Sequence, residues 1–261
     1  MTTIPPLNEK AIGDLAEELA RSSARLIAAA TALTDDQVRA PSALPAWTRS
    51  QVLMHVARSA DAYTWLLRSA RGCPHPGSRP NTAPPPGTTE GAAELAADLR
   101  LSLERFAEEA RALPADAWDR LVMALAGWRH PAWFTLWRCL RELETHHLDL
   151  RHGYRTADWP ASYVMWALDD TLATLKAQHF PVGSAEAVDL GRRWELTPGG
   201  PAVTADGHVL LGWLTGRTAG PGDNLPIPPA WPQPPTPGWG LGTPTLTAVD
   251  VIRDVISPYG R

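Results

Sequence analysis

The chain has 261 residues, 44% of them hydrophobic, so it can form one large domain or two small ones, each with its own core. Its formal net charge of −4 and the lack of a basic run argue against a nucleic-acid partner. No apolar segment is long enough to span a membrane, which argues against a membrane partner.

Two long helices are predicted first. Residues 8–33 repeat apolar side chains about every 3.6 positions, which indicates an amphipathic helix. A second helix begins near Thr48, a suitable capping residue, and runs to about Arg71. The segment 72–87 is rich in proline and glycine and is predicted to be a loop.

Two more helices complete the predicted first domain. The third starts at Thr88 or Thr89, and the fourth runs from about Pro131 to Arg151 after an irregular stretch at 118–128. Four long helices with one or two longer connections predict a mainly α protein, in which residues 1–156 form a four-helix bundle.

The rest of the chain differs in pattern. We expect a small α+β domain at 157–225 and a tail at 226–261 that packs on the surface, too rich in proline for regular structure. The domain's predicted elements are a helix at 160–178, strands within 188–197 and 200–207, and a short helix within 208–217.

The chain has only two cysteines, Cys73 and Cys139, and neither belongs to a CxxC pair. This excludes a disulfide scaffold or a thiolate zinc knuckle and fits a reducing compartment. The N-terminal residues MTTIPPLNEK also lack the regions of a signal peptide, so we expect a cytoplasmic protein. Cys139 lies inside a predicted helix and is expected in the core, whereas Cys73 lies in the loop.

The stretch RELETHHLDL, residues 141–150, holds a candidate metal site. Glu142 and His146 are four positions apart, so on a helix they lie on one face and can reach one ion. A catalytic zinc takes three protein ligands and keeps one position open. The best third candidate is His55, in the apolar run VLMHVARSA, because a buried histidine is costly unless something binds it.

Spacing alone leaves alternatives open. Glu144 and His147 are also spaced to share a face, and they could form the pair or a solvated surface. His55 could equally be a hydrogen-bonded histidine of the core.

Three runs, PAWTRSQVLMHVARSADAY, RELETHHLDL and DGHVLLGWLTGR, occur in the order typical of one family. The chain resembles the mycothiol-dependent maleylpyruvate isomerases, a branch of the DinB-like metal-dependent four-helix bundles, over most of residues 8–220. The resemblance implies that His55, Glu142 and His146 bind a divalent metal, expected to be zinc. It makes His147 a neighbour of the site, and Asp149 could orient a ligand from the outer shell.

The third run resembles the family's small C-terminal domain, which is akin to sterol-carrier folds. Its Gly-Arg pair maps to Gly216 and Arg217, and the resemblance implies a catalytic role for Arg217. A guanidinium can bind a carboxylate through two hydrogen bonds, which would suit a dicarboxylate substrate. An arginine at a helix C-terminus also simply favours the helix dipole.

The implied chemistry uses a small thiol, mycothiol, which the metal holds as a thiolate. Its addition to an activated double bond allows rotation and elimination, as in the isomerisation of maleylpyruvate. An S-transferase that keeps the adduct is one alternative, and a non-catalytic ligand-binding protein with a vestigial metal site is another. Amino-acid usage suggests a GC-rich, actinobacterial genome, the usual context of mycothiol.

The substrate and the assembly are less constrained. The substrate is expected to be a small electrophile, and the protein a monomer or a homodimer. Trp47, Trp65 and Trp137 could line an aromatic pocket for a bulky substrate or belong to the core. The 72–87 loop and the tail look specific to this chain and could reshape the mouth of the pocket.

Overall fold

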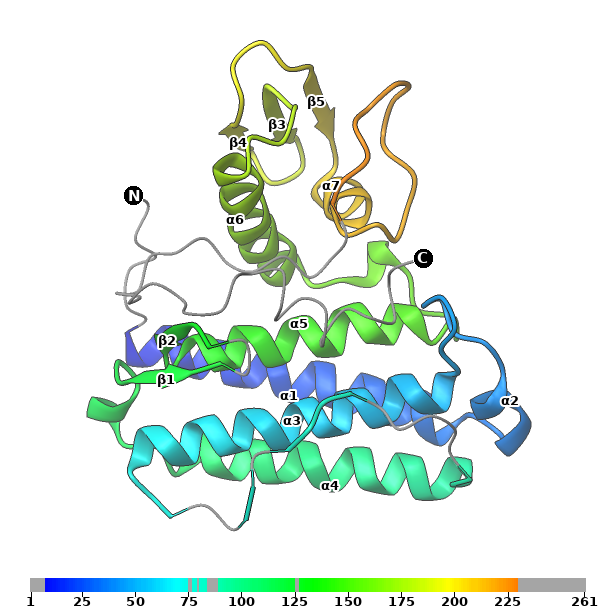
Figure 1. Ribbon diagram of the computed structural model, residues 1–261, viewed down its shortest axis with the longest axis vertical. Helices are drawn as coiled ribbons and strands as arrows, with labels where there is room; N and C mark the ends of the chain where they lie inside the picture. The colour runs from blue at the N-terminus through cyan, green and yellow to red at the C-terminus, as the bar shows by residue number, and fades with distance from the viewer. Residues whose placement is uncertain (1–7, 75–76, 79, 84–88, 125–126, 230–261) are drawn as a thin grey trace. The chain divides into compact units, whose positions relative to one another are not determined.

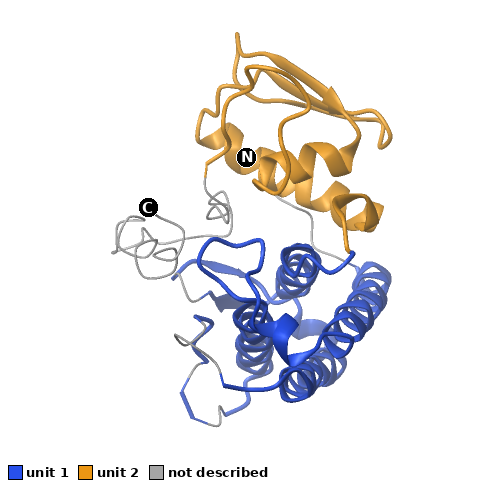
Figure 2. Ribbon diagram, turned by 90° about the vertical axis from the view of Figure 1, so that its right-hand side faces the viewer, with its two compact units in different colours: residues 1–153, 238–261 blue, residues 154–237 orange. Residues whose placement is uncertain are grey.

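The computed structural model describes residues 8–74, 77–78, 80–83, 89–124 and 127–229. The described chain divides into two compact units, which meet in the sequence at Gly153 and Tyr154 (Figure 2). The first unit carries the metal-site candidates and the second carries Arg217. Of the predicted tail, residues 230–261 lie outside the described residues.

The first unit is built on four long helices, which run side by side in Figure 1. They are α1 (Glu9–Thr31), α3 (Arg49–Arg71), α4 (Ala92–Arg111) and α5 (Phe134–Asp149). Helices α1 and α3 each pack against both α4 and α5. This arrangement is the four-helix bundle that the sequence predicts, and with the second unit it confirms the mainly α fold class.

Local sequence fixes where α3 begins and ends. The Thr48 side chain accepts a hydrogen bond from the Gln51 backbone N–H, and the Gln51 side chain accepts one from the Thr48 N–H. This capping box satisfies two backbone donors that a helix leaves unpaired at its start. Gly72 ends the helix with a φ of 76°, a left-handed conformation that glycine adopts without strain.

Leucines from all four helices fill the bundle interior. Leu26, Leu53, Leu99 and Leu140 are each at most 1% exposed. Full burial of one such side chain contributes about 1.5–3 kcal/mol before entropy losses. No helix in the described part of the chain has the length and apolar character needed to cross a membrane.

Several short elements differ from the expectation. Helix α2 (Asp35–Arg39) follows α1, and a hairpin of β1 (Leu121–Met123) and β2 (Arg129–Pro131) occupies part of the stretch predicted to be irregular. The third long helix begins at Ala92 rather than at Thr88 or Thr89. The fourth begins at Phe134 because Pro131 is paired with Leu121 in the hairpin. Elements of three to five residues are too short to show a hydrophobic period.

The second unit combines two helices with a three-stranded sheet. Its main elements are α6 (Ala161–Ala177), β3 (Ser184–Ala187), β4 (Arg192–Glu195), β5 (Ala202–Ala205) and α7 (Gly207–Leu214). The strand order is β4-β3-β5, with β3 antiparallel to β4 and parallel to β5. Strand β3 was not predicted, because its sequence SAEA has no β-branched or aromatic residue to indicate a strand. Two single-turn 3₁₀ helices, at Ala115–Ala117 and Thr156–Asp158, complete the described elements.

Candidate metal centre

His55, Glu142 and His146 come together where α3 packs against α5. His55 comes from α3, and the other two residues lie one turn apart on α5. The Nε2 atoms of both histidines lie 3.2 Å from Oε2 of Glu142. One ligand atom from each of the three residues lies within 4.8 Å of the other two. The three side chains therefore converge on a space that one metal ion could occupy.

The outer nitrogen of each histidine has its own acceptor. His55 Nδ1 lies 2.8 Å from the backbone oxygen of Thr82, and His146 Nδ1 lies 2.9 Å from Oδ2 of Asp149. A carbonyl and a carboxylate can only accept, so each Nδ1 carries the proton that is donated. Each Nε2 is then the nitrogen turned toward the centre. Metal-binding histidines commonly show this arrangement.

Electrostatics at this point favour a positive charge. Burial raises the pKa of Glu142, but hydrogen bonds from His146 and His55 outweigh it and hold this pKa well below its usual range. Burial lowers the pKa of His146, but hydrogen bonds to Asp149 and Glu142 outweigh it and raise this pKa to about 9. Both pKa shifts have the same cause, the close contact between acidic and basic groups. The negative charge of Glu142 and Asp149 would also favour a divalent cation.

Two further side chains hold the cluster in place. Tyr63, on α3, donates a hydrogen bond of 3.0 Å to Oε1 of Glu142, the oxygen that does not face the histidines. The ring of Trp47 packs edge-on against His55, with 5.4 Å between the ring centroids. The carboxylate and one imidazole are thus oriented by neighbours that are themselves buried.

The cluster remains partly open to solvent. The side chains of His55 and Glu142 are 19% and 23% exposed, whereas that of His146 is 9% exposed. The buried Leu140 and Leu143 flank Glu142 in the sequence of α5. Part of the cluster is therefore accessible to solvent.

The alternative pair, Glu144 and His147, is not part of this cluster. Glu144 is only 1% exposed and accepts hydrogen bonds from Ser22 and Arg25 of α1, the latter at 2.9 Å. His147 is buried and is absent from the group of possible ligands found among the described residues. Neither supplies a fourth ligand that would close the site.

Sequence reasoning missed three neighbours of the site. Thr82 contributes a backbone carbonyl, which no side-chain pattern can indicate, and Tyr63 lies eight positions after His55 with only aromatic character to mark it. Arg138 precedes Glu142 by four positions, so an R-x-x-x-E spacing could have placed it on the same face. Its guanidinium carbon lies 4.9 Å from the ring centroid of Tyr63.

The other residues singled out from the sequence are not among the possible metal ligands. Cys139 is buried as expected, and burial together with nearby Glu142 raises its thiol pKa well above the usual range. Trp65 and Trp137 are half-buried on α3 and α5. Arg217 follows α7 in the second unit and donates a hydrogen bond of 2.8 Å to the Thr215 carbonyl. Its catalytic role stays a prediction.

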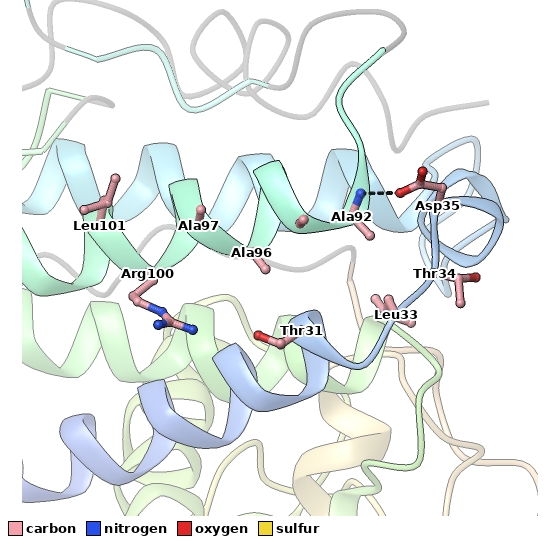
Figure 3. A pocket seen from close by; sticks show the side chains of 10 residues that line it. Thr31, Leu33, Thr34, Asp35, Ala92, Ala96, Ala97, Arg100 and Leu101 are labelled. Carbon is pink, nitrogen blue, oxygen red and sulfur yellow. Dashed lines mark hydrogen bonds between the residues drawn. The ribbon is translucent and has the colours of Figure 1, made fainter.

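A separate groove of about 580 Å³ lies between the end of α1, α2 and the first turns of α4 (Figure 3). Of the ten residues that line it, Asp35 and Arg100 are charged. Asp35 accepts a 2.8 Å hydrogen bond from the Ala92 N–H and thereby caps α4. None of the possible metal ligands lines this groove.

Comparison with known proteins identifies the family of the first unit. The family model of the mycothiol maleylpyruvate isomerase N-terminal domain matches residues 19–151, more than half of the chain. The chain belongs to this family. The matched segment contains all three possible ligands and ends two residues after Asp149.

Solved structures show the same fold. The chain is similar to the crystal structure of the mycothiol-dependent maleylpyruvate isomerase and to that of a mutant of this enzyme with one histidine replaced by alanine. For each, the identity is 22%, the TM-score is 0.74, and the match covers 88% of this chain and 100% of the other. None of the curated protein sequences compared with the chain matches it.

Proposed function

We propose that the protein is a metal- and mycothiol-dependent enzyme that acts on an activated double bond, as in the cis–trans isomerisation of maleylpyruvate. The observation that carries the proposal is the convergence of two histidine nitrogens and one carboxylate oxygen on one point. Membership of the mycothiol maleylpyruvate isomerase family supports the choice of thiol and of reaction.

The three residues suit zinc. Imidazole nitrogen and carboxylate oxygen are ordinary zinc ligands, and three protein ligands leave one position open for a thiol. The acceptors at Thr82 and Asp149 fix both rings, so the nitrogens facing the ion need no reorientation when it binds. His55, Glu142 and His146 would therefore hold the metal, and Asp149 would orient His146.

A divalent cation bound here would lower the pKa of a coordinating thiol, so that the thiol is present as a nucleophilic thiolate at neutral pH. The protein's own cysteines are poor candidates for that thiol. The Cys139 thiol is buried and its pKa is raised, and Cys73 lies beyond the end of α3 beside Arg71. An external small thiol fits the partly exposed site better.

Metal analysis of the purified protein tests the centre directly. We expect about one zinc per chain in the wild type and loss of zinc in both His55→Ala and His146→Ala. Zinc retained at full occupancy in either variant would remove that histidine from the site. A folded wild-type protein that takes up no zinc or nickel would instead favour a ligand-binding protein with a vestigial centre.

The products formed by the zinc-loaded protein then show which reaction it catalyses. Incubation with mycothiol and maleylpyruvate should give the trans isomer with the thiol recovered unchanged. A stable adduct between thiol and electrophile would identify an S-transferase, and no turnover in the presence of bound zinc would contradict both enzymatic readings.

A further inference from the structure

Arg138 lies beside the proposed metal centre and has unusual surroundings for an arginine. It precedes Glu142 by one helical turn on α5, so both side chains lie on one face of the helix. Its guanidinium carbon lies 4.9 Å from the ring centroid of Tyr63 and 5.0 Å from that of Trp128. The group is therefore placed over two aromatic rings, one from α3 and one from the β1–β2 hairpin.

A histidine fixes one edge of this guanidinium. Nη1 of Arg138 lies 3.2 Å from Nε2 of His130, which is fully buried. His130 Nδ1 lies 2.8 Å from the Pro131 carbonyl and so donates to it, which leaves Nε2 as the acceptor for Arg138. The two rings and this one hydrogen bond hold the guanidinium in a single orientation.

What Arg138 lacks, within the described chain, is a carboxylate partner. Other arginines of the bundle have one: Arg58 pairs with Asp98 at 2.6 Å, and Arg105 pairs with Asp61 at 2.7 Å. Arg138 is half-buried, and a partly desolvated charge without a counter-charge is costly. Its planar fork has five N–H donors, of which His130 takes one.

We propose that Arg138 is a substrate-binding residue that accepts a carboxylate of an unsaturated, planar carboxylic acid. The assignment rests on the proposed function, because it gives the same site its substrate class. Four helical positions separate Arg138 from Glu142 by about 6 Å along the axis. A carboxylate held at Arg138 would place a double bond a few atoms away near the metal-bound thiol, with the Tyr63 and Trp128 rings beside it.

Calorimetric titration of the zinc-loaded protein with maleate tests this without turnover, because no thiol is added. We expect Arg138→Gln to weaken maleate binding about 10- to 100-fold, the loss of a charge-assisted hydrogen-bonded pair. Arg138→Lys keeps the charge but loses the fork, so it should fall between wild type and Arg138→Gln. Dimethyl maleate, which has no charge, should bind all three proteins alike.

Arg141→Gln is the matched control, since Arg141 is also half-buried on α5 and lies next to Glu142 in the sequence. It should change maleate affinity by less than about threefold, because it removes a positive charge but leaves the guanidinium of Arg138 in place. An equal loss of maleate affinity in both variants would mean that only the overall positive charge matters, and it would overturn the assignment. Unchanged affinity in Arg138→Gln would overturn it as well, and if that variant does not fold, Arg138→Lys decides in its place.

Zinc content of the same samples separates this inference from the proposed function. One zinc per chain without Arg138-dependent maleate binding would remove the carboxylate site and leave the metal centre. Arg138-dependent binding in a protein that takes up no zinc would support the carboxylate site and remove the metal chemistry.

Discussion

Helix α5 carries two carboxylates only two positions apart, Glu142 and Glu144, and their surroundings differ. Two positions along a helix turn a side chain by about 200°, so the two carboxylates point to nearly opposite sides. Glu142 meets α3, where His55 Nε2 lies beside it and Tyr63 donates to it, and Glu144 meets α1, where Ser22 and Arg25 donate. The neighbouring helix therefore supplies a different set of partners to each.

The partners decide what each carboxylate can do. Arg25 is permanently charged, so Glu144 has its counter-charge within the protein and is only 1% exposed. The partners of Glu142 are histidines and a tyrosine, and its positive partner can be a proton or a metal ion. A carboxylate whose counter-charge can be exchanged is suited to binding, and one with a fixed counter-charge is suited to holding helices together.

Exchanging each carboxylate for its amide should give the largest difference between the two positions. Glu142→Gln should reduce bound zinc to below about a tenth of an ion per chain, because an amide is a poor zinc ligand. Glu144→Gln should retain its zinc and lose about 1–3 kcal/mol in the free energy of unfolding, because Arg25 loses its charged partner. Metal analysis and urea unfolding of both variants measure the two effects.

The opposite pattern, with zinc lost from Glu144→Gln and retained in Glu142→Gln, would mean that the wrong carboxylate has been assigned. Loss of zinc from both variants, with both well folded, would mean that the two clusters act as one site.

The same contrast shows what the sequence could and could not predict. The helical period predicted the bundle, and the resemblance to a known family selected Glu142 over Glu144. Spacing alone left both pairs open, because each pair can share a face of α5. The choice depends on α1 and α3, whose contacts with α5 join residues more than 80 positions apart.

Other parts of the site were beyond sequence reasoning for physical reasons. The acceptor for His55 is the main-chain oxygen of Thr82, which any residue at that position would supply. The contacts of Arg138 depend on a hairpin whose strands have only three residues each and leave no periodic signal. The contact of Asp149 with His146 could be predicted, because residues three positions apart share a face of a helix.

Asp149 offers a second, smaller test of the Glu142 cluster. Asp149→Asn keeps the shape of the side chain but weakens the acceptor for His146 Nδ1, which lies 2.9 Å away. Loss of such an outer partner typically lowers metal affinity about 10- to 100-fold. Competition with a chelator of known zinc affinity measures the change.

The control for this variant is Asp61→Asn, which breaks an ion pair with Arg105 between α3 and α4 and touches neither histidine. Its zinc affinity should match that of the wild type. If Asp149→Asn also binds zinc as tightly as the wild type, the Asp149 contact is structural and His146 is held in place by packing alone.

The smallest expected effect concerns the Glu142 oxygen that does not face the histidines. Tyr63→Phe removes the 3.0 Å hydrogen bond to Oε1 and keeps the ring over which Arg138 lies. A hydrogen bond to a charged carboxylate is worth about 1.5–3 kcal/mol, but this one forms with or without the ion, so zinc affinity should lose only part of it and fall about two- to tenfold. The chelator competition measures this change too, with Tyr163→Phe, a buried tyrosine of the second unit, as the control. A loss as large as that of Asp149→Asn would mean that both oxygens of Glu142 bind the ion, since removing the phenol would then disturb a ligand atom directly.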